Sequence, residues 1–328
     1  MVKLSVEQIV AATHAQLLHR GTREVAGCAV IDSREVQQGS LFVAFAGEKV
    51  NGNSYLLSAA QAGAAVVVAS EPVTDNLLAT GVSVLEAADD DCEAFLLALA
   101  VAWREAHPNW LVVGVTGSVG KTTTKEMLRR GIGATRRVHA TAGNHNNLIG
   151  LPLTVLSTPE DTEVLVLELG MNHAGEITRL TSVARPTVAV ITNVGTSHIG
   201  LLGSRENIAR AKGELVEAIG KDGRGGTVIL NADNAFVAKM REKARPGVKV
   251  VTFGIENAAD VRALIDTIET VGGSATRFAV EYAGERHVFE IKMVGRPNVM
   301  NALAAIAAGI VLGFSADEIE AGLKNLEA

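Results

Sequence analysis

The chain has 328 residues, 48% hydrophobic and 20% charged, which is the composition of a globular protein with enough length for two domains. Its formal net charge of −6 and the lack of a basic block argue against a nucleic-acid partner. The two distant cysteines, Cys28 and Cys92, match no metal spacing and no disulfide framework. There is no signal peptide and no apolar run long enough to span a bilayer, so we expect a cytoplasmic protein without membrane insertion.

The first hundred residues have the pattern of a small α/β module. Ser5 and Gln8 form a capping box that predicts an opening helix. Short strands are expected at 39–47 and 64–69, with a helix at 55–62 between them. Ser33 and Arg34 either bind an anion or only close a turn, and the local sequence favours the turn.

A domain boundary is expected near residue 108. An apolar helix at 93–106 is followed by His107-Pro108-Asn109, which ends the helix and acts as a linker. We therefore expect an N-terminal domain over 1–108 and a central domain over 109–328.

The stretch from Leu111 to Arg129 predicts a nucleotide-binding loop. An apolar β-branched run leads into a glycine-rich turn and then into a helix-forming sequence. Glycines let backbone N–H groups turn toward phosphate oxygens, and a helix N-terminus adds positive potential. Lysine supplies a cation, and the next hydroxyl can hold Mg²⁺. The usual pattern has a glycine where this chain has Val115. The predicted nucleotide ligands are Gly117, Ser118, Gly120, Lys121, Thr122 and Thr123.

The central domain alternates strands and helices, which predicts an α/β fold with a doubly wound, mostly parallel sheet around the phosphate loop. Ligands of such sheets lie at the carboxyl ends of strands. The expected helices are 121–133, 175–181 and 205–219. A hairpin is expected at 276–293, followed by helices at 302–312 and 315–326. The expected strands are 111–116, 163–169, 187–193, 227–231 and 249–253.

Two further strand ends carry candidate metal ligands. Glu168 ends an apolar strand and is either bound to a partner or simply faces solvent. His198 lies in a polar loop after another strand, where a surface histidine and a ligand are equally expected. Thr122, Glu168 and His198 can together surround magnesium, although histidine is an unusual Mg²⁺ ligand.

Three other polar features have ordinary alternatives. The loop at 140–152 contains Asn144 and Asn147 and is either a ligand loop or a turn. The charge pattern around Lys212, near Glu214, favours a solvated helix lysine. Asn298 precedes an alanine-rich helix and is expected to act as its cap.

Five stretches in chain order resemble the Mur ligases of peptidoglycan synthesis, and within that family the members that add D-alanyl-D-alanine. The resemblance covers essentially the whole chain. The stretches are Asp32–Arg34 with Gly39–Ala44, Gly114–Met127, Asn144–Thr154, Glu168–Ile177 and Gly203–Glu214.

The resemblance implies an ATP-dependent amide ligase. ATP would phosphorylate the terminal carboxylate of UDP-N-acetylmuramoyl-tripeptide, and the amine of D-alanyl-D-alanine would attack the acyl phosphate. A monomer is expected. The implied cofactors are ATP and Mg²⁺, with Thr122, Glu168 and His198 as metal ligands. Lys121, Lys212 and His198 are the implied catalytic residues, with Lys212 carbamylated.

The same resemblance assigns the remaining ligand contacts. Asn298 and Asn301 lie near adenine in the family pattern. Ser33 and Arg34, with Asn144 and Asn147, are expected to bind the UDP-linked substrate.

The sequence departs from the family in three places. Asn51-Gly52-Asn53 stands where the family usually has Asp-Gly-His, and Pro297 replaces a histidine. The family also carries a third domain, and this chain stops before it, so we expect the C-terminal ligase domain to be absent. Because domain closure completes such sites, weak nucleotide binding and little turnover are expected.

Other function classes stay open at this stage. Another Mur-type or folylpolyglutamate-like ligase would share these motifs. A phosphate-loop NTPase switch would hydrolyse ATP without any UDP-sugar, but it leaves the module at 32–47 unexplained. A non-catalytic binding fragment is the fourth hypothesis.

Overall fold

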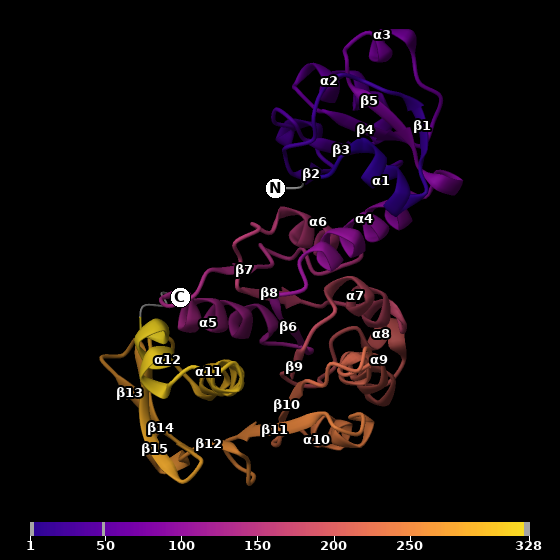
Figure 1. Ribbon diagram of the computed structural model, residues 1–328. Helices are drawn as coiled ribbons and strands as arrows, with labels where there is room; N and C mark the ends of the chain where they lie inside the picture. Colours follow the sequence, from indigo (N-terminus) through magenta and orange to yellow (C-terminus); the bar gives the residue numbers. More distant parts are fainter. Residues whose placement is uncertain (1–2, 48–49, 325–328) are drawn as a thin grey trace. The chain divides into compact units, whose positions relative to one another are not determined.

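The computed structural model describes residues 3–47 and 50–324 (Figure 1). Its internal contacts divide the chain into two units. The first unit comprises residues 1–108 and 148–160, and the second comprises 109–147 and 161–328. Within the described ranges, no helix is both long enough and apolar enough to cross a membrane.

The first unit is built on a five-stranded sheet in the order β1-β5-β4-β3-β2. Strand β1 is antiparallel to β5, and the other neighbours are parallel. Strands β3 and β4 are fully buried, as continuous apolar runs predict. The strands are β1 (Gln16–His19), β2 (Ala29–Val30), β3 (Leu41–Val43), β4 (Val66–Ala69) and β5 (Ser83–Glu86).

The helices of the first unit begin at recognisable caps. The capping box of Ser5 and Gln8 is present as predicted, with the Gln8 N–H donating to Ser5 Oγ at 3.2 Å. Asp91 caps α4 through the Ala94 N–H at 2.8 Å. The α-helices are α1 (Val6–Thr13), α2 (Leu56–Gln61), α3 (Asp75–Leu78), α4 (Cys92–Ala106) and α6 (Gly150–Ser157), and the 3₁₀ turns are η1 (Ser33–Glu35), η2 (Gly52–Tyr55) and η3 (Ala88–Asp90).

The second unit contains a ten-stranded mixed sheet in the order β13-β14-β12-β11-β10-β9-β6-β8-β7, with β15 paired to β14. Strands β7 to β12 with β6 run parallel, and β13 to β15 add an antiparallel extension. The mostly parallel sheet is therefore confirmed. The strands are β6 (Leu111–Thr116), β7 (Val138–Ala140), β8 (Val164–Glu168), β9 (Val188–Ile191), β10 (Thr227–Asn231), β11 (Lys249–Gly254), β12 (Val261–Ala263), β13 (Glu269–Val271), β14 (Ala275–Tyr282) and β15 (Glu285–Ile291).

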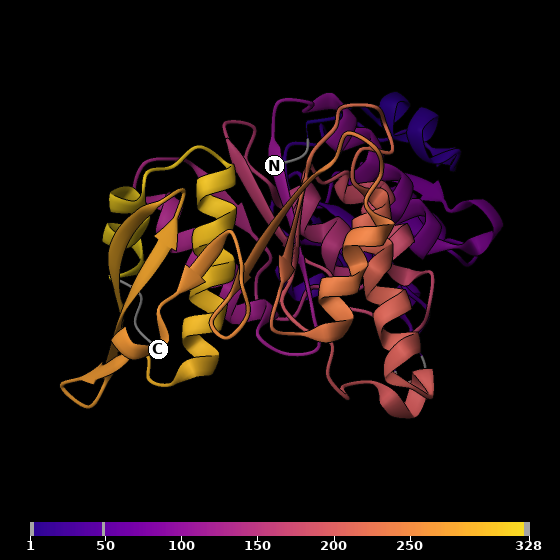
Figure 2. The same cartoon turned by 90° about the horizontal axis from the view of Figure 1, so that it is seen from below.

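Helices cover both faces of this sheet. Helices α5, α11 and α12 pack together on one face, and α7 and α9 pack on the other (Figures 1 and 2). The helices are α5 (Lys121–Gly133), α7 (Glu176–Ala184), α8 (Ile199–Leu202), α9 (Arg205–Ala218), α10 (Ala235–Lys239), α11 (Arg296–Val311) and α12 (Ala316–Leu323), with the 3₁₀ turns η4 (Met240–Lys243) and η5 (Ile265–Thr267).

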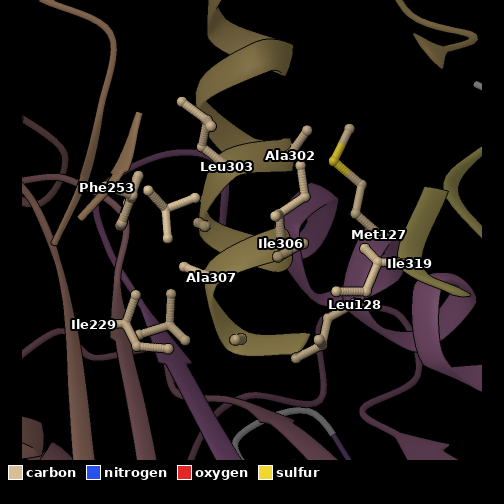
Figure 3. Close-up of a cluster of buried hydrophobic side chains, with 14 of the residues drawn as sticks. Met127, Leu128, Ile229, Phe253, Ala302, Leu303, Ile306, Ala307 and Ile319 are labelled. Carbon is tan, nitrogen blue, oxygen red and sulfur yellow. The ribbon is translucent and has the colours of Figure 1, made fainter. Parts of the chain in front are cut away.

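Helix α11 fills the centre of the hydrophobic core on its face of the sheet. Its small and branched side chains, such as Ala307 and Ile306, lie between the strands and the α5–α12 pair (Figure 3). Phe253 of β11 and Met127 of α5 flank it on opposite sides. This packing fixes α5, and so the loop that precedes α5, against the sheet.

Several element boundaries differ from those predicted; α7, for example, ends at Ala184 instead of 181. Helix α11 begins at Arg296 instead of 302, because Pro297 is tolerated in a first helical turn. Asn298 therefore lies inside the helix and is not its cap; Gly295 is at the cap position. The hairpin turn holds only Ala283 and Gly284, both with positive φ. Helix α12 has its predicted capping box at Ser315, and the expected residues 325–326 lie outside the described part of the chain.

Replacing Thr124 by valine is expected to stabilise the protein by about 1 kcal/mol. Thr124 of α5 is fully buried, and within the described ranges its hydroxyl has no hydrogen-bond partner. Valine keeps the shape and removes an unsatisfied polar group. Urea denaturation measures the change. Thr154→Val is the matched control and should destabilise, since the Thr154 hydroxyl donates to the Gly150 carbonyl at 2.9 Å. A less stable Thr124→Val variant would contradict this explanation.

Candidate active site

The phosphate loop joins β6 to α5 at the carboxyl edge of the parallel sheet. Gly120 is the N-cap of α5 and has a left-handed backbone with φ of 81°, which glycine adopts without strain. Lys121 folds back over the loop, and its Nζ donates to the Gly117 carbonyl at 3.0 Å. Burial lowers the pKa of Lys121, while the charge of Glu168 acts in the opposite direction. A cation and the first N–H groups of a helix therefore meet at one point, which suits an anion.

Asn193 and Thr192, just after β9, hold the phosphate loop from the side. Asn193 Oδ1 accepts from the N–H groups of Ser118 at 3.1 Å and Val119 at 3.0 Å. Asn193 Nδ2 donates to the Val119 carbonyl at 3.1 Å, and the Thr192 hydroxyl donates to the same carbonyl at 2.7 Å. We call Ser118, Val119, Thr192 and Asn193 the loop clamp. The clamp occupies the backbone N–H groups of Ser118 and Val119. The N–H groups from Gly120 onward, at the start of α5, are therefore the ones available to an anion.

The two predicted asparagines of α11 have different neighbours. A methyl group on Gly120 would lie 2.2 Å from Asn301 Oδ1, so the Asn301 side chain lies directly against the phosphate loop. Asn298 Nδ2 donates to the Val294 carbonyl at 2.9 Å, one turn earlier. The structure thus places the Asn301 side chain against Gly120 of the phosphate loop.

Glu168 ends β8 as a buried carboxylate. Only 2% of the residue is exposed, so the solvent-facing alternative is wrong. Thr122 Oγ1 donates to Glu168 Oε2 at 2.8 Å, and Asn146 Nδ2 donates to Oε1 at 2.7 Å. A buried carboxylate needs such partners or a cation. The structure therefore joins two of the three predicted metal ligands.

These residues fit magnesium. The carboxylate of Glu168 and the hydroxyl of Thr122 are hard oxygen donors, and Mg²⁺ is commonly bound by one carboxylate together with substrate phosphates. Over residues 3–47 and 50–324 no group of three or more His, Cys, Asp or Glu forms a metal site by itself. A cation here would thus depend on the nucleotide for further ligands.

His198, the third predicted ligand, makes no hydrogen bond to Thr122 or Glu168 in the part of the chain that the structure describes. It is exposed, with a left-handed backbone (φ 66°) at the start of α8. Its pKa is lowered by partial burial, then by the charges of Lys212 and Lys121.

Lys212 of α9 is buried, with 1% of the residue exposed, so the solvated lysine that the charge pattern favoured is wrong. Burial, followed by the charge of Lys121, lowers its pKa from 10.5 to about 7. Glu214 is engaged elsewhere, because its carboxylate accepts from the N–H groups of Gly175 and Thr178. A large fraction of Lys212 is thus a neutral amine at pH 7.

The first unit has a pocket of about 560 Å³ next to Arg34, which lies on the turn η1. Asp32 caps this turn and pairs with Arg34, whose Nη2 lies 2.5 Å from Asp32 Oδ2. The Arg34 guanidinium lowers the pKa of Asp32 to about 2. The turn interpretation is therefore confirmed, because Asp32 closes the turn. Ser33 and Arg34 line the pocket, and anion binding by them stays a prediction. Other lining residues are Ile31, Phe45, Val50 and Tyr55.

The unusual Asn51-Gly52-Asn53 segment has an internal role in the same unit. Asn51 Oδ1 accepts from the Asn53 N–H at 3.0 Å, and Asn53 Oδ1 accepts from the Ser70 N–H at 3.0 Å. A methyl group on Gly52 would lie 2.7 Å from the Phe45 carbonyl oxygen. The segment shapes the pocket wall that carries Tyr55.

Comparison with known proteins assigns both units. A model of the Mur ligase middle domain matches residues 115–309, more than half of the chain, and a model described as "Mur ligase family, catalytic domain" matches 28–104. The chain belongs to the Mur ligase family. The resemblance predicted from the motifs is thus confirmed, together with the α/β fold.

Similar proteins within the Mur ligases include UDP-N-acetylmuramoyl-tripeptide–D-alanyl-D-alanine ligase of Bacillus subtilis, which is 39% identical over 90% of this chain. The crystal structure of MurF from Acinetobacter baumannii is 30% identical, with a TM-score of 0.88, and the match covers 100% of this chain and 70% of that one. MurF of Thermotoga maritima in complex with ADP has a TM-score of 0.79 at 26% identity, covering 93% and 67%. This Mur ligase chain spans 61% of the Bacillus protein.

The sequence reasoning missed three residues of this Mur ligase site: Asn146, Thr141 and Asn193. Of the asparagines in the 144–147 stretch, Asn144 and Asn147 are exposed, whereas Asn146 binds Glu168. The Asn-rich composition was the available signal, but it does not say which asparagine points inward. Asn193 is the last residue of the predicted strand 187–193, and that position at the carboxyl edge of the sheet could have identified it.

Proposed function

We propose that this chain acts in an ATP-dependent, ADP-forming amide ligase that joins D-alanyl-D-alanine to UDP-N-acetylmuramoyl-tripeptide. The observation that carries the proposal is the Thr122–Glu168 pair, 2.8 Å apart, beside Lys121 on a phosphate loop. The Bacillus relative of that name and the ADP complex of the Thermotoga neighbour support it.

The proposed chemistry has two steps. A carboxylate oxygen of the tripeptide attacks the γ-phosphorus, the bond to ADP breaks, and an acyl phosphate forms. The amine of D-alanyl-D-alanine then attacks the acyl carbon, phosphate leaves, and the amine loses a proton. Lys121 would stabilise charge on the transferred phosphoryl group. Thr122 and Glu168, with His198 beside them, would hold Mg²⁺, which neutralises phosphate charge when bound. Asn301 would contact the nucleotide, with Asn298 next to it.

The UDP-linked substrate is proposed to bind the pocket of the first unit. Arg34 offers a cation and Ser33 a hydroxyl to the diphosphate, and Tyr55 offers an aromatic face. Asn144 and Asn147 are proposed as further substrate-binding residues. A monomer in the cytoplasm, where ATP is available, belongs to the same proposal.

Lys212 is proposed to be carbamylated. A neutral buried amine can attack CO₂, giving a carbamate and releasing one proton, which converts the side chain to an anion near Lys121. Its signature would be a ¹³C carbonyl resonance that appears with labelled bicarbonate and is absent from Lys212→Met.

Calorimetric titration tests the proposal. The chain should bind UDP-N-acetylmuramoyl-tripeptide and should bind UDP-glucose much more weakly. It should also bind Mg-ADP, and Lys121→Ala should weaken Mg-ADP binding by about 10- to 100-fold, which is the contribution of a charge-assisted contact. Lys249→Ala, at the exposed start of β11, is the control and should leave binding unchanged. Mg-ADP binding without any UDP-substrate binding would instead favour the NTPase alternative.

A further inference from the structure

Lys125 is a buried lysine to which the proposed chemistry assigns no role. It lies on α5 one turn after Thr122, and only 1% of it is exposed. Its Nζ donates to the Thr141 carbonyl at 2.5 Å and lies 3.0 Å from Glu126 Oε1. A buried ammonium group must keep such partners, so this contact fixes the position of Thr141 against α5.

Thr141 carries that restraint to Glu168. It directly follows β7, and its own N–H donates to the Val166 carbonyl of β8 at 3.0 Å. Its hydroxyl accepts from the Glu168 N–H at 3.0 Å. Thr141 thus accepts a hydrogen bond from Lys125 at its carbonyl oxygen and one from the backbone N–H of Glu168 at its hydroxyl.

The 141–147 loop then returns to the same carboxylate. Asn146 Nδ2 donates to Glu168 Oε1 at 2.7 Å, and the Asn146 carbonyl accepts from the Gly170 N–H at 2.8 Å. A methyl group on Gly170 would lie 2.6 Å from Asn146 Oδ1, so the loop and the strand end are in close contact. Oε1 of Glu168 is therefore held by the loop, and Oε2 by Thr122.

We propose that Lys125 is a positioning residue that orients the Glu168 carboxylate for a divalent cation, acting through Thr141 and the 141–147 loop. The inference rests on the proposed function in one respect, because it assumes that a metal–nucleotide complex binds at this edge. Residues that orient a metal ligand typically change metal affinity by about 10- to 100-fold when replaced.

The test compares ADP dissociation constants with Mg²⁺ and with EDTA. In Lys125→Met, the gain in affinity that Mg²⁺ gives should shrink about 10-fold, whereas the EDTA value stays within about twofold of the native one. A merely structural role would change both values together. Arg129→Met is the matched control, because Arg129 pairs with the same Glu126 from the same helix without touching Thr141; its Mg²⁺ gain should equal the native gain.

Hydrogen exchange and a second variant keep the test decisive. In Lys125→Met, the amides of Glu168 and Gly170 should exchange faster, while those of β10 are unchanged. Thr141→Val removes only the hydroxyl that accepts from Glu168 and should lower the Mg²⁺ gain in the same direction. The inference is overturned if Mg²⁺ increases ADP affinity as much in both variants as in the native chain and the Glu168 and Gly170 amides exchange at native rates. A native chain that binds ADP in neither condition rejects the proposed function instead, and the exchange rates still decide whether Lys125 positions Glu168.

Discussion

A Gly117→Ala variant is expected to bind Mg-ADP about 100-fold more weakly than the native chain. The added methyl group would lie 1.8 Å from Thr192 Oγ1, an atom of a residue that is only 3% exposed. Thr192 has little freedom to move, because its hydroxyl donates to the Val119 carbonyl in the loop clamp. Relieving the overlap must therefore displace the phosphate loop itself. Calorimetric titration with Mg-ADP measures the loss.

Two further variants separate this clash from general damage. Gly133 is the last residue of α5, the helix that follows the phosphate loop. A methyl group there meets no atom within 4 Å, so Gly133→Ala should bind Mg-ADP as the native chain does. Adding Thr192→Ala to Gly117→Ala removes the overlapping oxygen and should recover part of the affinity. Native binding by Gly117→Ala alone would show that the clamp does not set the shape of the loop.

A Lys212→Met variant is expected to be more stable than the native chain by roughly 4 kcal/mol at pH 6, since each pKa unit corresponds to about 1.4 kcal/mol. The pKa of Lys212 falls from 10.5 to about 7 on folding, mainly through burial. Between these values the unfolded chain binds more protons, so the cost of burying Lys212 is full below pH 7 and is lost as the pH rises toward 10.5. The advantage of methionine should therefore shrink steadily from pH 7 to pH 10.

Urea denaturation of both proteins across this pH range, in buffer freed of bicarbonate, measures the difference. Comparing the two proteins at each pH removes the effect of groups that they share. Lys221→Met, an exposed lysine three residues after α9, is the control and should show a small difference at all pH values. A Lys212→Met variant less stable than the native chain at pH 6 would mean that the ammonium group has a stabilising partner.

The local features that decide the phosphate loop could be predicted from the sequence. β6 and α5 have the predicted bounds, Leu111–Thr116 and Lys121–Gly133. A mostly β-branched run marks the strand, and Gly120 at the N-cap position marks the start of the helix. The rule that ligands gather at the carboxyl ends of parallel strands also placed Glu168 correctly beside Thr122.

Features that depend on tertiary packing could not be read in the same way. The burial of Lys212 follows from how α9 packs on the sheet, and its neighbours Arg210 and Glu214 suggested a solvated face instead. Asn146 and Asn144 are two residues apart and chemically identical, yet only a loop conformation decides which of them reaches Glu168. The start of α11 was missed because proline is compatible with a first helical turn and with a preceding loop alike.

The loop clamp also has a consequence for the order of folding. The hydrogen bonds that the Ser118 and Val119 N–H groups donate to Asn193 close chain segments 74 to 75 residues long, and they require β9 to be paired with β6. Contacts of such long sequence separation form late, because the entropy of closing the segment must be overcome first. A nascent or partly unfolded chain therefore has the complete glycine-rich sequence but no nucleotide site. If nucleotide binds as proposed, it is a ligand of the native state alone, and a higher nucleotide concentration makes unfolding of the second unit rarer.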